Sequence, residues 1–127
     1  SALNQWFVST YKNLYGTYPS GPAYQYGQAI LAAKIAYDKA GSDASDEALG
    51  DALRGITFES FSTTVEMSLG GGHQAVTENG YGITEYDSEN GENVVKDVKF
   101  YPASCVNPPE GQNSVEWIKG GMKGAKC

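Results

Sequence analysis

The segment Pro19-Ser20-Gly21-Pro22 constrains the fold more than any other feature of the chain. A proline inside a helix removes a backbone donor and clashes with the preceding turn, so one continuous helix cannot pass through this segment. Before it, residues 3–14 predict a helix that stops at Gly16, because four apolar side chains recur at helical spacing. These side chains are Leu3, Phe7, Tyr11 and Leu14. After it, Pro22 suits the first turn of a second helix, which we expect to end near Ala40.

The rest of the chain reads as a third helix followed by strands. Cap-forming and acidic residues over 42–47 precede an apolar face at Ala48, Leu49, Ala52 and Leu53, which predicts a short helix. The apolar period then changes to two, and we expect strands at 56–58, 63–69, 81–87 and 93–101. On the last strand, Val94, Val98 and Phe100 are predicted to share one face.

Two further details follow from the turn residues. Asn90-Gly91 predicts a type I′ turn between the last two strands, because both central residues of that turn need positive φ. Beyond Pro102 we expect an irregular tail, with one helical turn at most over 115–118 and a mobile end from Gly120.

Composition places the chain among globular proteins. Its 127 residues can form a core, and helices followed by antiparallel strands indicate an α+β fold. The net charge of −6 and the pI of about 4.6 argue against binding to nucleic acid or to anionic lipid. No apolar run is long enough to span a bilayer.

The sequence offers little support for an enzyme. The one histidine, His73, follows three glycines, and a lone histidine in such a loop is most often simply solvated. The triglycine lacks the lysine and the Ser/Thr of a phosphate-binding loop. No nucleophile–base pair is visible. We therefore expect no catalytic residue, no metal and no cofactor.

The two cysteines, Cys105 and Cys127, leave two interpretations open. They are either unrelated thiols or one disulfide that holds the polar C-terminal tail, and the second interpretation requires an oxidising compartment.

Tyrosine is the residue most suggestive of binding. The chain has nine tyrosines, and five of them lie near the helix break. A tyrosine ring combines an apolar face with a hydroxyl and suits small amphipathic ligands. Packing explains Tyr11 and Tyr37 well, whereas Tyr24 and Tyr26 open the second helix, where the edge of a cleft could lie.

Five segments, in order, resemble the C-terminal part of the type I periplasmic solute-binding proteins of ABC transporters, in the branched-chain amino acid and amide/urea branch. These segments are Trp6 to Pro19, Ala23 to Gly41, Asp46 to Phe58, Gly72 to Gln74, and Val98 to Pro109. They are similar to the family's F-x-x-x-Y-x-x-x-Y-G-x-x-P, alanine-rich K-A-G, A-L-R-G-x-x-F, D-H-Q and closing strand-and-proline segments. One segment departs: Ser60-Phe61-Ser62-Thr63-Thr64 stands where members usually carry a glycine in a T-P-x-G segment.

The resemblance implies a two-lobed α/β parent, of which this chain resembles only the last third. It implies a first-lobe part over 1–72, a hinge crossing and hairpin over 73–104, and a tail over 105–127. A small solute would bind between the lobes, near Pro22, Tyr24 and Tyr26, and the closed form would dock on a membrane permease. The hinge would include His73, Gln74 and Ala75.

The same resemblance implies a periplasmic or extracellular location. Without the missing partner of the apolar face Ile30–Ala33–Tyr37, the isolated chain is expected to self-associate. A ligand-sensing receptor domain of the same fold and a free-standing α+β interaction module remain alternatives.

Overall fold

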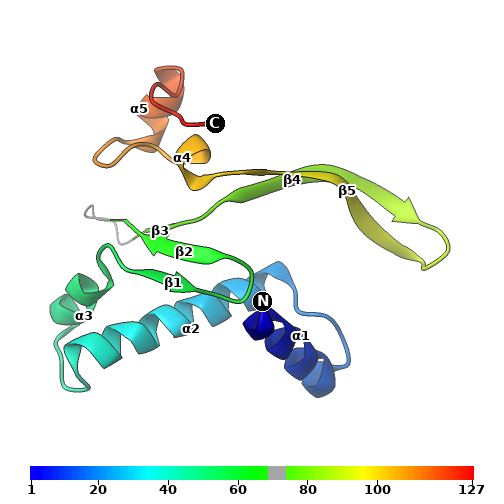
Figure 1. The fold of residues 1–127 in the computed structure, drawn as a ribbon, viewed down its shortest axis with the longest axis horizontal. Coiled ribbons are helices and arrows are strands. Elements are labelled where there is room, and N and C mark those ends of the chain that lie inside the picture. The colour runs from blue at the N-terminus through cyan, green and yellow to red at the C-terminus, as the bar shows by residue number, and fades with distance from the viewer. Residues whose placement is uncertain (69–73) are drawn as a thin grey trace. The chain divides into compact units, whose positions relative to one another are not determined.

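Three helices and a small antiparallel sheet form the first of two units in the computed structural model, which describes residues 1–68 and 74–127 (Figure 1). This unit covers Ser1–Val76. Its elements are α1 (Ala2–Tyr15), α2 (Gly21–Ala40), α3 (Asp46–Leu53), β1 (Thr57–Glu59), β2 (Thr64–Met67) and β3 (Ala75–Val76). The sheet has the order β1-β2-β3, with both pairs antiparallel.

The second unit covers Thr77–Cys127 and holds a two-stranded ribbon and two short helices (Figure 1). Its elements are β4 (Asn79–Asp87), β5 (Glu92–Tyr101), α4 (Ala103–Val106) and α5 (Ser114–Lys119). Helices and antiparallel strands thus make an α+β chain, which confirms the fold class predicted for these 127 residues.

The helix ends follow from the capping residues. Gly16 closes α1 with a φ of 71°, a left-handed conformation that costs glycine little. The Ser45 hydroxyl accepts a hydrogen bond from the Ala48 amide and so caps the start of α3. Pro22 lies in the first turn of α2, where its missing N–H would have had no intrahelical partner. The three helices therefore lie where local sequence predicts them.

Phe61 lies at the centre of the first unit's core. Its ring stacks on Phe7 of α1 with centroids 4.3 Å apart, and it also lies near Trp6 at 6.4 Å. A Cβ added at Gly27 of α2 would lie 2.5 Å from the Phe61 ring, so the two positions interlock. Other buried side chains of this unit come from the helices and β2: Ala36, Ala52, Ser60, Val65 and Met67.

Helix α2 is apolar on two sides, and the unit covers only one of them. On the inner side Ala36 is buried, and the Lys39 ammonium donates a hydrogen bond to the Ala52 carbonyl of α3. On the outer side Tyr26 is 74% exposed and Ile30 is 70% exposed. The predicted stripe that includes these two residues therefore faces away from the described part of its unit.

The β4–β5 ribbon differs from the sequence prediction in its turn. Asp87 pairs with Glu92, so four residues rather than two connect the strands. The Asp87 carboxylate accepts hydrogen bonds from the amides of Glu89 and Asn90, and Gly91 alone of the loop residues has positive φ. The predicted type I′ turn is wrong because this side chain organises a longer loop with a single left-handed residue.

The predicted face of the last strand is wrong for Val94, whereas Val98 and Phe100 do share a face beside Gly80. A bulge places Asp97 and Val98 opposite the single residue Gly82, and Asp97 takes a φ of 52°. An extra residue reverses the alternation of side chains beyond it. Val98 therefore shares a face with Val95, and both approach Gly82.

The segment after Pro102 is more ordered than predicted. The expected turn over 115–118 lies within α5, but α4 was not foreseen. The tail is held by backbone contacts: the Lys126 amide donates to the Ser104 carbonyl, and Met122 donates to the Trp117 carbonyl. Trp117 and Cys105 are the buried residues of these helices.

Candidate functional site

The residues predicted to line a ligand cleft point in different directions. Tyr24 is half-buried and meets the Phe7 ring edge-on, with centroids 5.0 Å apart. Tyr26 lies two residues later on the same helix, about 200° further around its axis, and is exposed. Pro22 is exposed at the first turn. The structure therefore separates Tyr24, which packs against α1, from Tyr26 on the outer side of α2.

The outer side of α2 forms an apolar strip along the helix. It contains Tyr26, Ile30, Ala33 and Tyr37, spaced three or four residues apart. Every residue of this strip is exposed, so the packing predicted for Tyr37 is wrong within the described residues. Its chemistry suits apolar packing, with two phenol hydroxyls as the only side-chain hydrogen-bonding groups.

The last turns of α1 and the linker after it carry a second group of aromatic side chains. The Lys12 ammonium lies 4.2 Å from the centroid of the Tyr18 ring and donates to its hydroxyl at 3.1 Å. Tyr11 and Tyr15 lie side by side, with centroids 4.6 Å apart. The Lys12–Tyr18 contact joins the linker to α1, whereas Tyr11 and Tyr15 both belong to α1.

The predicted hinge residues fall at the end of the first unit. His73 lies outside the described residues. The Gln74 carbonyl accepts a hydrogen bond from the Ser68 amide at 2.9 Å, and Ala75 pairs with Met67 in the β2–β3 ladder. The chain passes into the second unit after Val76, one residue beyond Ala75.

Cys105 and Cys127 are joined by a disulfide. The bond links α4 to the last residue of the chain, across 22 positions of sequence. Beside it, Lys126 and Ser104 share two hydrogen bonds, one from each residue to the other's carbonyl. The disulfide thus closes a loop that contains α5.

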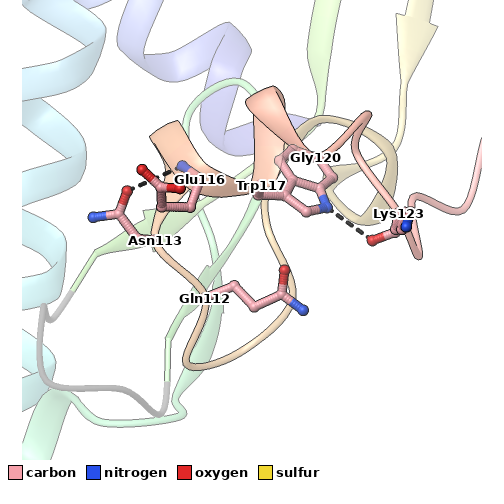
Figure 2. A pocket seen from close by; sticks show the side chains of 6 residues that line it. All are labelled: Gln112, Asn113, Glu116, Trp117, Gly120 and Lys123. Carbon is pink, nitrogen blue, oxygen red and sulfur yellow. Dashed lines mark hydrogen bonds between the residues drawn. The ribbon is translucent and has the colours of Figure 1, made fainter.

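A hollow beside α5 was not foreseen from the sequence. Its volume is about 330 Å³, and Figure 2 shows the side chains around it. Its lining consists of Gln112, Asn113, Glu116, Trp117, Gly120 and Lys123. The Trp117 indole donates to the Lys123 carbonyl at 2.9 Å, and the Asn113 side chain caps α5 (Figure 2). The sequence feature that could have indicated this hollow is a tryptophan within a polar, glycine-rich tail.

The carboxylates with shifted pKa serve local structure. At the start of α3, the pKa of Glu47 is lowered by a hydrogen bond from its own backbone amide and, to a lesser extent, by one from the Ser45 hydroxyl. Hydrogen bonds from the Asn90 side chain and from the Glu89 and Asn90 amides lower the pKa of Asp87 in the ribbon loop. Glu47 is exposed and Asp87 is half-buried, and both carboxylates bond to neighbouring residues of their own cap or turn, which is typical of local structure and not of a catalytic cleft.

Residues 1–68 and 74–127 contain neither a cluster of metal ligands nor a membrane-spanning helix. No three side chains of His, Cys, Asp or Glu lie close enough together there to hold a metal ion. No helix in that part of the chain is long and apolar enough to cross a membrane.

Comparison with known proteins gives no family. No model of a known protein family matches the chain, and no curated protein matches it significantly.

Proposed function

We propose that the chain is the C-terminal part of the substrate-binding component of an ABC transporter. The parent would bind a small solute, such as an amino acid, an amide or a urea-like compound, between two lobes and deliver it to a membrane permease. The proposal rests on the ordered resemblance of five segments together with one structural observation, the two-sided apolar character of α2.

Helix α2 has the surface of an interior helix. Among the described residues of the first unit, α1, α3 and the loop at Phe61 cover only its inner side. Its outer strip contains Tyr26, which is 74% exposed, and Ile30, which is 70% exposed. A helix with apolar side chains on two sides typically packs between other elements, as a helix at the face of a larger sheet would.

Within this proposal the three cleft residues take different roles. Tyr26 and Pro22 remain exposed at the start of α2 and could contact a solute. Tyr24, which packs on Phe7, would set the angle between α1 and α2 and so act as a positioning residue. The Cys105–Cys127 disulfide supports a periplasmic or extracellular location, because disulfides persist mainly in oxidising compartments.

A thermal-shift screen of the intact parent tests the proposal. Amino acids and amides should raise the melting temperature, because a ligand that binds only the folded state stabilises it. Tyr26→Ala should reduce the shift. Tyr37→Ala, on the same strip but three turns further along α2, is the matched control and should leave it unchanged. Stabilisation by sugars or nucleosides alone would contradict the proposed solute class.

The β4–β5 ribbon favours a second candidate, an interaction module. Aromatic and aliphatic side chains on it are more than half exposed: Tyr81, Ile83, Tyr86, Val95 and Phe100. Gene context separates the two candidates, since a neighbouring permease and ATPase favour transport. A thermal-shift screen without any small-molecule response, together with a stable protein complex, would favour the module.

A further inference from the structure

The same tripeptide, Glu-Asn-Gly, occurs twice in the second unit. It covers residues 78–80, where β4 begins, and residues 89–91, in the loop that joins β4 to β5. An asparagine before glycine is prone to lose its side-chain amide, because glycine has no side chain to shield the backbone nitrogen that attacks it. Both asparagines have glutamate before them and glycine after them, so the fold must account for any difference in their reactivity.

The reaction joins the backbone nitrogen of the glycine to Cγ of the asparagine. The bond from Cγ to the side-chain nitrogen breaks, the glycine nitrogen gives up its proton, and ammonia leaves. Water then opens the resulting succinimide at either carbonyl. The product is aspartate, or isoaspartate, in which the main chain passes through the side-chain carbons. The glycine nitrogen reaches Cγ only if the backbone rotates between the asparagine Cα and its carbonyl carbon.

The site in β4 is held against this rotation. Asn79 pairs with Tyr101, and Gly80 pairs with Phe100, in the β4–β5 ladder. The Phe100 ring also lies 3.0 Å from the position that a Cβ on Gly80 would take, so it covers this side of the glycine. Rotation at Asn79 would therefore break the strand pairing at this end of the ribbon and displace an aromatic ring.

The site in the loop has neither restraint. Asn90 and Gly91 lie beyond the last strand pair, Asp87 with Glu92, and both are exposed. Among the described residues, a Cβ added at Gly91 would meet no atom within 4 Å. Rotation at Asn90 therefore costs only the hydrogen bonds of the loop itself.

Asp87 supplies the hydrogen bonds that restrain the reacting groups of the loop. Its carboxylate accepts from the Asn90 side-chain nitrogen at 2.8 Å, and its backbone carbonyl accepts from the Gly91 amide, also at 2.8 Å. The first bond holds the leaving group of the reaction, and the second holds the attacking nitrogen. Asp87 therefore limits how often the two reacting atoms meet.

We infer that Asn90 is a site of spontaneous deamidation whose rate Asp87 holds down, whereas the β4–β5 ladder protects Asn79. The reaction adds one negative charge to a chain whose net charge is −6. It replaces the donor beside the Asp87 carboxylate by a second carboxylate, so like charges face each other and the loop loses a contact that organises it. This modification goes beyond the proposed transport function and does not depend on it.

Incubation of the full chain at mildly alkaline pH tests the inference. Cleavage after Tyr86 by chymotrypsin puts the two sites on separate peptides, and mass spectrometry detects the exchange of NH2 for OH in each. Asn90 should convert several-fold faster than Asn79 in the folded chain. The two rates should become similar in guanidinium chloride, because unfolding removes the ladder and the loop contacts together.

Asp87→Ser tests the restraint. The serine hydroxyl can still accept from the backbone amides of the loop, but it is too short to hold the Asn90 side chain. The rate at Asn90 should rise several-fold in the folded variant and stay unchanged in denaturant. Asn90→Gln is the control for the assignment and should abolish the mass change at this position, because attack on the longer side chain needs a larger ring.

Equal rates at Asn79 and Asn90 in the folded chain, or no conversion of Asn90 there, would overturn the proposed site. An unchanged rate at Asn90 in folded Asp87→Ser would overturn the role of Asp87. Far-UV circular dichroism of each variant confirms that the chains compared are folded. If Asp87→Ser does not fold, the ratio of the two wild-type rates still decides the site.

Discussion

At the scale of single residues, Gly27 and Phe61 decide how α2 meets the loop before β2. Phe61 is buried and stacks on Phe7, and it occupies the space that a side chain at position 27 would need. Phe61 also belongs to the segment that departs from the family pattern. A glycine within a helix is therefore explained here by close packing, and the helical period cannot reveal such a contact between distant residues.

We predict that Gly27→Ala destabilises the first unit. The added Cβ would lie 2.5 Å from Cε2 of Phe61, so the ring must move. Overpacking typically costs about 1–3 kcal/mol. The better helix propensity of alanine returns about 0.8–1 kcal/mol. The expected net loss is on the order of 1 kcal/mol, measured by urea unfolding.

Gly21→Ala is the matched control on the same helix. An added Cβ at Gly21 meets no atom within 4 Å, and its φ is ordinary. This variant should be neutral or slightly stabilising. Equal effects of the two substitutions would show that the Phe61 contact does not constrain position 27.

Asp87 should make the ribbon loop sensitive to acid. Hydrogen bonds from the Asn90 side chain and then from two backbone amides lower its pKa in the folded state. The ionised form therefore favours the folded loop. This stabilisation is present above the ordinary pKa of 3.8 and is lost as the pH falls through the lower folded value.

The amide resonances of Glu89 and Asn90, followed by NMR against pH, measure this effect. They should shift in the acid range in the wild type, and Asp87→Asn should flatten the profile because it removes the titrating group. An unchanged profile in Asp87→Asn would assign the acid response to another group.

At the scale of elements, the C-terminal tail is organised by its disulfide and by Trp117. The indole is 5% exposed and donates to the Lys123 carbonyl, while Lys126 and Ser104 hold the segment beside α4. Helix α4 is too short for its apolar pattern to predict a helix. No sequence pattern predicts the hollow beside α5. The disulfide joins α4 to a residue 22 positions further along the chain, a contact that local sequence does not encode.

We predict that Cys127→Ser releases the tail and exposes Trp117. A disulfide that closes a loop of this length stabilises by roughly 3 kcal/mol in the chain-entropy estimate, so its loss should free residues 120–127. The tryptophan emission should shift to longer wavelength. Measurements in a Trp6→Phe background remove the signal of the other, exposed indole.

Mass spectrometry with and without reductant supplies the control, since the wild type should gain two hydrogens per chain on reduction. An emission spectrum that is identical in the two proteins would mean that the hydrogen bonds hold Trp117 without the disulfide.

At the scale of the whole chain, both units leave large apolar side chains in solvent. The strip on α2 and the side chains of the ribbon belong to different units, and each is exposed within the described residues. A typical monomer exposes single apolar residues, whereas groups of exposed apolar side chains such as these mark a contact with further protein. The transport proposal assigns Ile30, Ala33 and Tyr37 of the α2 strip to contact with the rest of the parent.

We predict that the isolated 127 residues do not bind amino acids or amides tightly. Tyr26 and Pro22 are exposed, and a ligand beside them would stay largely solvated, whereas tight sites enclose most of a ligand's surface. Titration calorimetry should show no heat of binding at micromolar concentrations. Micromolar affinity in this chain alone would mean that the parent's second lobe is not needed.

The sequence by itself determined the helices, their ends and the α+β order. Periodicity, capping residues and prolines act over a few neighbouring residues, so they can be read locally: Gly16, Pro22 and Ser45 behave as expected. The tertiary structure alone decided the outcome wherever distant residues meet. Periodicity does not encode the close packing of Phe61 against Gly27. Nor does it encode the bulge that brings Val98 to the face of Val95, or the loop that the Asp87 side chain organises. Packing also separated Tyr24 from Tyr26, because one side of α2 meets α1 and the other meets solvent.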